Sequence, residues 1–147
     1  MSAALTLPVG LLGGCHCGNI RVDFMSARSP MQLPLRACAC SFCRAHGART
    51  TVDPNGRLGL RLLDEDAVSR YRFGLKTADF LVCRRCGVYV GALMTHGHGT
   101  FGLLNVNVLD VREVFRQTAS SVDYEGEQTQ ERTARRAAEW TPAKLSR

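Results

Sequence analysis

The sequence has little of what marks a nucleic-acid-binding protein. Lysine occurs only twice, and no basic run is longer than an arginine doublet, although the 147 residues include 19 basic and 13 acidic side chains, a formal net charge of +6. Aromatic residues make up only 7% of the chain and are scattered. Nucleic-acid-binding surfaces usually cluster basic charge and interleave it with aromatic rings. These shortages argue against a nucleic-acid partner, and the basic excess fits a small anionic ligand at least as well.

Long apolar runs are also missing. None approaches the length of a membrane span, so we expect no membrane partner. The first residues, MSAALTLPVGLL, lack a basic start and a small-residue cleavage pattern and are interrupted by Pro8. We therefore interpret residues 1–12 as a leader or edge segment and expect a cytoplasmic protein. Apolar residues make up 45% of the chain, an ordinary share for one folded domain.

Cysteine, by contrast, is plentiful. The chain has seven cysteines and no secretory signal, and an odd number leaves one unpaired, which argues against a disulfide framework. The cysteines instead form two close pairs, each followed by glycine, and one group of three. Such clustering is typical of metal ligands.

The two pairs stand in the segments CHCG, from residue 15, and CRRCG, from residue 83, which we call knuckles. A tight turn brings both sulfurs of a knuckle to one ion, and the following glycine permits the positive φ that such a turn needs. Two knuckles supply four thiolates, the closed tetrahedral set of a structural zinc. We predict that this zinc is held by Cys15, Cys17, Cys83 and Cys86.

The third group comprises Cys38, Cys40 and Cys43. In an extended segment Cys38 and Cys40 point the same way, and a turn after Ser41 can return Cys43 to them. Three protein ligands with an open fourth position are the arrangement of catalytic zinc. The alternative is a second structural site closed by a histidine, for which His46 is the best-placed candidate. An iron–sulfur cluster would also want a fourth protein thiolate.

Hydrophobic periodicity predicts a mainly β protein. Alternating residues and short apolar runs predict strands at residues 19–24, 58–62, 71–73, 88–94 and 104–108. Asp64 is expected to open a helical turn before the third of these strands. Residues 112–147 change in character, because residues 127–139 favour a helix that lacks a strong apolar stripe. We interpret this C-terminal extension as partly helical, forming a surface helix or a mobile arm.

Several motifs together resemble a known family. GGCHCG, CACSFCRAHGA, a C-x-x-C-G knuckle and LNVNVLD occur in the order found in the glutathione-dependent formaldehyde-activating enzyme family, which includes centromere protein V. The resemblance covers residues 13–110, which suggests a zinc-binding domain at residues 13–111. It implies the Mss4-like fold, several coiled β-sheets built around zinc. It also assigns the two knuckles to the structural zinc and Cys38, Cys40 and Cys43 to the catalytic one.

The resemblance also implies an activity. The founding enzyme of the family joins formaldehyde to glutathione, giving S-hydroxymethylglutathione, and is classed as a carbon–sulfur lyase. We therefore expect a zinc-dependent lyase or synthase with two Zn²⁺ per chain, acting on a small thiol such as glutathione and a small aldehyde. Arg44 and Arg49 follow the three-cysteine group and are candidates to pair with carboxylates of the thiol; the alternative is solvated surface arginines. The competing function is a non-catalytic zinc module for protein or nucleic-acid partners.

Overall fold

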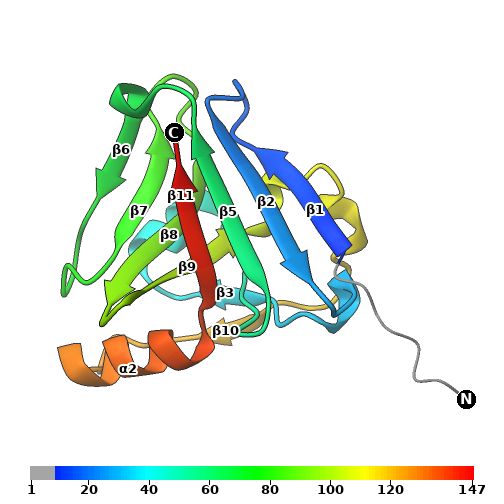
Figure 1. Ribbon diagram of the computed structural model, residues 1–147. Coiled ribbons are helices and arrows are strands. Elements are labelled where there is room, and N and C mark those ends of the chain that lie inside the picture. The colour runs from blue at the N-terminus through cyan, green and yellow to red at the C-terminus, as the bar shows by residue number, and fades with distance from the viewer. Residues whose placement is uncertain (1–8) are drawn as a thin grey trace, which may run out of the picture.

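Eleven short strands, joined by backbone hydrogen bonds, make up much of residues 9–147, the part of the chain that the computed structural model describes (Figure 1). The strands are β1 (Val9–Gly14), β2 (Ile20–Ser26), β3 (Arg36–Cys38), β4 (Thr50–Thr51), β5 (Arg57–Leu62), β6 (Val68–Tyr71), β7 (Asp79–Cys83), β8 (Tyr89–His96), β9 (Gly99–Asn105), β10 (Ser120–Val122) and β11 (Thr141–Ser146). The helices are α1 (Ser41–His46) and α2 (Thr129–Glu139), with 3₁₀ turns at Pro30–Gln32, Glu65–Ala67, Val106–Val108 and Arg112–Val114. The predicted mainly β fold with a short C-terminal helix is confirmed.

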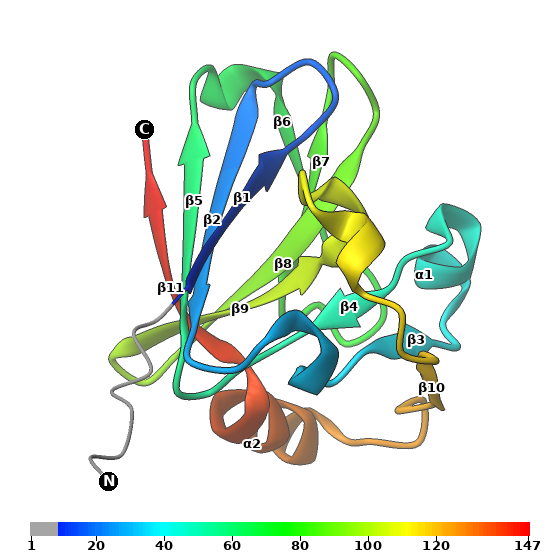
Figure 2. The same ribbon diagram turned by 90° about the vertical axis from the view of Figure 1, so that its right-hand side faces the viewer.

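The strands form one branched sheet. Its main path runs β1-β2-β5-β11-β9-β4-β3-β10, and β8, β7 and β6 branch from β9 in that order. The long strands make up one side of the molecule in Figure 2, and α1, β3 and β10 gather on the other. No helix in residues 9–147 is long and apolar enough to cross a membrane.

The main core lies between the two branches of the sheet. β2 alternates buried and exposed residues along its whole length, and its register with β5 places Val22 opposite Leu60 and Phe24 opposite Leu58. These side chains belong to one apolar cluster with Leu81 of β7 and Leu104 of β9. The period-2 pattern thus predicted β2 and β5 correctly, because each has one face against the core and one against solvent.

Two predicted strands differ from the structure. β9 ends at Asn105, and residues 106–108 form a 3₁₀ turn instead of continuing the strand. The Asn105 side chain accepts a hydrogen bond from the Asn107 backbone N–H (3.3 Å), a local bond that competes with strand pairing. The strand predicted at 71–73 lies earlier, at Val68–Tyr71, because a turn with left-handed residues at Gly74 (φ 60°) and Lys76 (φ 56°) follows it.

Near the two chain ends, the structure of the described residues agrees only partly with the sequence prediction. Of the expected leader, residues 1–8 lie outside the described residues, and residues 9–12 belong to the edge strand β1. Helix α2 agrees with the sequence prediction. Strand β11 was not predicted: it pairs parallel with β5 and antiparallel with β9, inside the strand order (Figure 1). The C-terminal extension is therefore part of the sheet and does not stand apart as an arm.

A buried polar network holds β11 in place. The hydroxyl oxygen of Thr141, a fully buried residue, accepts a hydrogen bond from the Asp53 backbone N–H (2.8 Å). The Asp53 carboxylate in turn accepts hydrogen bonds from the Ser26 hydroxyl and from the Asn55 N–H. The network therefore joins β11 to the end of β2 and to the turn before β5.

We expect Thr141→Val to lower the free energy of unfolding by about 1–3 kcal/mol, because the nearly isosteric valine leaves the buried Asp53 N–H without an acceptor. Urea unfolding followed by circular dichroism measures the change. Thr95→Val on the exposed end of β8 is the matched control and should change the free energy by less than about 0.5 kcal/mol. Equal unfolding midpoints for the two variants would show that the network does not hold β11.

Candidate metal centres

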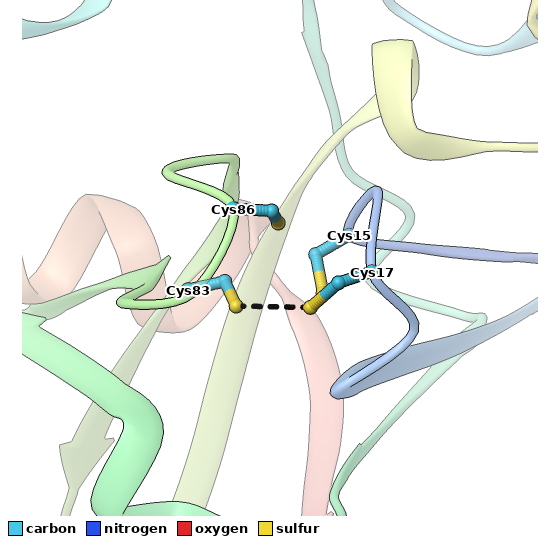
Figure 3. Close-up of side chains that lie close together, drawn as sticks. All are labelled: Cys15, Cys17, Cys83 and Cys86. Carbon is cyan, nitrogen blue, oxygen red and sulfur yellow. Dashed lines mark hydrogen bonds between the residues drawn. The ribbon is translucent and has the colours of Figure 1, made fainter.

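The first candidate centre lies between the two knuckles. Cys15 and Cys17 follow β1, and Cys83 and Cys86 lie at the end of β7 and just beyond it. Figure 3 shows the four sulfur atoms directed toward one another from the two loops. All four lie within 4.8 Å of one another, with Sγ–Sγ distances of 3.8 Å for Cys15–Cys17 and 3.5 Å for Cys17–Cys83. A tetrahedral zinc with Zn–S bonds of about 2.3 Å sets its sulfurs about 3.8 Å apart, so this donor set fits zinc.

The glycine that follows each knuckle has the backbone that was predicted. Gly18 has φ 84° and Gly87 has φ 77°, values that L-residues with a side chain rarely adopt. The two turns are closed by hydrogen bonds from the Gly18 N–H to the Cys15 carbonyl (3.1 Å) and from the Gly87 N–H to the Cys83 carbonyl (2.8 Å). Both glycines are therefore required by the turns that bring each pair of sulfurs together.

Backbone N–H groups also act on the sulfurs of this centre. The Ile20 N–H donates to Cys15 Sγ at 3.2 Å. Burial, the largest influence, raises the pKa of the Cys15 thiol to about 11. Burial also opposes ionisation of Cys86, but the N–H groups of Cys17 and Val88 and two neighbouring thiols lower its pKa to about 6. Four thiolates this close would repel one another, and a cation among them would favour the thiolate form of all four.

The second candidate centre is the group formed by Cys38, Cys40 and Cys43, whose sulfurs lie within 4.8 Å of one another. Cys38 ends β3, and Cys40 is the N-cap of α1, where its sulfur accepts a hydrogen bond from the Cys43 N–H (3.4 Å). The predicted turn after Ser41 is therefore the first turn of α1, and it brings Cys43 back to the other two sulfurs. We call these residues the three-cysteine group.

No histidine or carboxylate of residues 9–147 completes the three-cysteine group. His46 lies at the exposed end of α1, with its ring centroid 4.6 Å from that of Phe42 and 5.4 Å from that of Tyr89. The structure thus places His46 against aromatic rings and does not bring it into the group. The three thiolates leave one position of a tetrahedral zinc for a ligand from outside the group.

The three sulfurs are strongly coupled in their ionisation. A hydrogen bond with the Cys43 thiol lowers the pKa of Cys38 to about 5, and the same contact raises the pKa of Cys43. Burial, together with the neighbouring cysteines, raises the pKa of the Tyr89 hydroxyl well above its ordinary value. One thiolate is thus stabilised at the expense of its neighbour, a conflict that a divalent cation would remove.

The three-cysteine group lines a cavity of about 470 Å³, a volume in the range of small-molecule sites. Part of the lining is apolar and is provided by Phe73, Phe80, Leu103 and Trp140. Another part is strongly basic and consists of Arg36, Arg44, Arg132, Arg135 and Arg136. None of the four cysteines of the knuckles lines this cavity. The two centres therefore differ: one ties two loops together, and the other borders a space that a ligand can fill.

The two arginines singled out in the sequence have different surroundings. Arg44 is exposed and lines the cavity. Arg49 is not part of the lining. Its guanidinium donates hydrogen bonds to Asn107 Oδ1 (3.0 Å) and to the Phe115 carbonyl (3.1 Å), so this side chain stabilises the fold. The arginines of α2 were not predicted as cavity residues; the doublet Arg135-Arg136 is their one signal in the sequence.

Comparison with known proteins adds support for the fold. No family model matches the chain. A crystal structure of a Rhodobacter sphaeroides protein, a structural genomics target, is similar to it with a TM-score of 0.56 and 26% sequence identity. The match covers 76% of this chain and 99% of that one.

We expect the purified protein to hold two Zn²⁺ per chain and to release them in two steps. The three-cysteine group should release its ion first, because it supplies fewer protein thiolates than the knuckles do. Elemental analysis along a graded chelator titration measures both steps. A metal content that never exceeds one ion per chain would contradict the two-centre arrangement.

We expect Cys17→Ala to unfold or aggregate the protein and Cys40→Ala to leave it folded with one zinc. A structural zinc contributes about 10–16 kcal/mol in small zinc domains, as much as the whole stability of a typical protein, about 5–15 kcal/mol. Cys17 is exposed and Cys40 is half-buried, so loss of packing adds little to either change. Thermal melts with metal analysis compare the two, and equal damage would mean that both centres are structural.

Proposed function

We propose that the protein is a zinc-dependent carbon–sulfur lyase or synthase that acts on a thiol–aldehyde adduct of the S-hydroxymethylglutathione type. The observation that carries the proposal is the place of the three-cysteine group. Its three sulfurs, without a fourth ligand from residues 9–147, line a cavity of about 470 Å³. The cysteine motifs resemble those of the glutathione-dependent formaldehyde-activating enzyme family, whose fold is Mss4-like. This resemblance supports the same activity.

The donor set suits the ion that this chemistry needs. Cys38, Cys40 and Cys43 would hold Zn²⁺ through three thiolates and leave one position open. Zinc bound there would stabilise the thiolate form of a thiol at neutral pH and polarise a carbonyl oxygen. The part of the chain around the cavity then has two tasks, which are to bind both reactants and to limit the access of water.

The reaction is an addition and needs no redox partner. In the synthase direction a carbon–sulfur bond forms between the thiol sulfur and the aldehyde carbon, and the π bond of the carbonyl breaks. The proton lost by the sulfur ends on the former carbonyl oxygen. The lyase direction reverses each of these changes. No electrons are gained or lost, which agrees with the choice of zinc, an ion without redox chemistry.

The lining of the cavity favours this addition by holding the reactants together. Phe73, Phe80 and Trp140 provide an apolar wall beside the three-cysteine group. Their rings reduce contact with water, which strengthens electrostatic interactions in the site. Two reactants held in one cavity also avoid much of the entropy cost of a bimolecular encounter.

We expect the zinc-loaded protein to speed the interconversion of glutathione, formaldehyde and S-hydroxymethylglutathione above the spontaneous rate. Exchange NMR at equilibrium measures both directions in one sample. Replacing a residue that only supports the metal ligands typically costs about 10–100-fold in activity. Cys40→Ala removes a ligand itself and should reduce the catalysed rate by more than this. His46→Ala is the control and should retain activity, because His46 is not part of the group. A wild-type rate equal to the spontaneous one would favour a non-catalytic zinc module.

A further inference from the structure

Arg136 of α2 is a buried cation on the wall of the cavity. Its exposed fraction is 9%, and it lines the same cavity as the three-cysteine group. Nη1 donates to the Thr77 hydroxyl (2.9 Å), and the guanidinium carbon lies 4.6 Å from the centroid of the Trp140 ring. The buried Nε atom has no hydrogen-bond partner among residues 9–147. One edge of the guanidinium is thus held by the protein, and Nε is left without an acceptor.

Three neighbouring arginines of the cavity differ from Arg136 in having carboxylate partners. Arg135 pairs with Glu127 at 2.7 Å, and Arg132 pairs with the same carboxylate at 3.3 Å. Arg36 pairs with Glu139 at 3.1 Å. Within the described part of the chain no carboxylate lies within ion-pair distance of Arg136. Among Arg36, Arg132, Arg135 and Arg136, the most buried arginine is therefore the one without a carboxylate partner.

Burying a charge without a partner is costly, so buried charges in proteins are almost always paired. Burial, reinforced by the positive charges of Arg132 and Arg135, lowers the pKa of Arg136 to about 10. The guanidinium remains charged at neutral pH. The basic wall of the cavity therefore contains a permanent cation whose position is fixed and whose hydrogen bonds are incomplete.

We propose that Arg136 binds a carboxylate of the thiol that enters this cavity and so makes the protein selective for acidic thiols over neutral ones. The inference rests on the proposed function, because it assumes that the sulfur of the same molecule lies at the three-cysteine group. A guanidinium presents paired N–H donors that match the two oxygens of a carboxylate. Arg136 is thus a specificity-determining residue that acts at the end of the substrate away from the reacting sulfur.

The test compares 3-mercaptopropionate with its methyl ester, which keeps the thiol and removes the negative charge. On the zinc-loaded full chain, calorimetric titration should show the acid binding at least about tenfold more tightly than the ester. Arg136→Met, which keeps an unbranched side chain but removes the guanidinium, should abolish that preference. Arg135→Met is the matched control and should keep it, because Arg135 is already paired with Glu127.

Stability provides a second readout. Because Arg136→Met removes an unpaired buried cation, its melting temperature without ligand should equal or exceed that of the wild type. Arg136→Lys keeps the charge but not the paired donors, so it should retain part of the preference. If Arg136→Met does not fold, Arg136→Lys and the wild-type comparison of acid and ester still decide the matter.

The possible failures are distinguishable. Equal affinity of the wild type for acid and ester would overturn the role of Arg136 and leave the proposed function standing. Binding of 3-mercaptopropionate no tighter than that of 3-(methylthio)propionate, which cannot supply a thiolate, would overturn the proposed function. In that case the affinity for 3-(methylthio)propionate still tests Arg136: a loss of at least about tenfold in Arg136→Met supports the carboxylate site, and no loss overturns it.

Discussion

The mutual approach of four cysteine sulfurs is the constraint on which the rest of the structure depends. The knuckle at Cys15 and Cys17 belongs to the β1–β2 branch of the sheet, and the knuckle at Cys83 and Cys86 to the β7–β8 branch. Thiolates at such distances repel one another, so their meeting is stable only around a cation. A cation bound there would fix the separation of the two branches, whose apolar side chains form the leucine-rich core.

Short strands connect the three-cysteine group to the part of the sheet that contains the knuckles. β4 pairs with β9 over two residues, β3 pairs with β4 at one position, and β10 pairs with β3 over three. Few backbone bonds therefore connect α1 and its cysteines to the core, whereas the knuckles lie directly on it. The two candidate centres thus differ in how firmly the fold holds them as well as in the number of sulfurs.

Features encoded by neighbouring residues could be predicted from the sequence, and features made by distant contacts could not. Both knuckles, the turn after Ser41 and the alternation of β2 follow from local spacing. The stretch 104–108 was misjudged because the hydrogen bond of the Asn105 side chain, and not hydrophobic alternation, decides its backbone. β11 was missed because TPAKLS contains a proline and a lysine and becomes a strand only between β5 and β9. The arginines that α2 adds to the cavity wall could not be predicted either, because contacts between distant parts of the chain place them there.

The place of β11 also bears on how the protein reaches its native state. Its first residues pair with β9 and its later ones with β5, so Ala143 lies beside Leu58, a partner far away along the chain. Contacts of such high sequence separation slow folding, because a large loop must close before they form. Until β11 docks, the edges of β5 and β9 have unpaired backbone groups, which are natural sites of association with other chains. Docking of α2 and β11 thus covers these edges as well as completing the cavity.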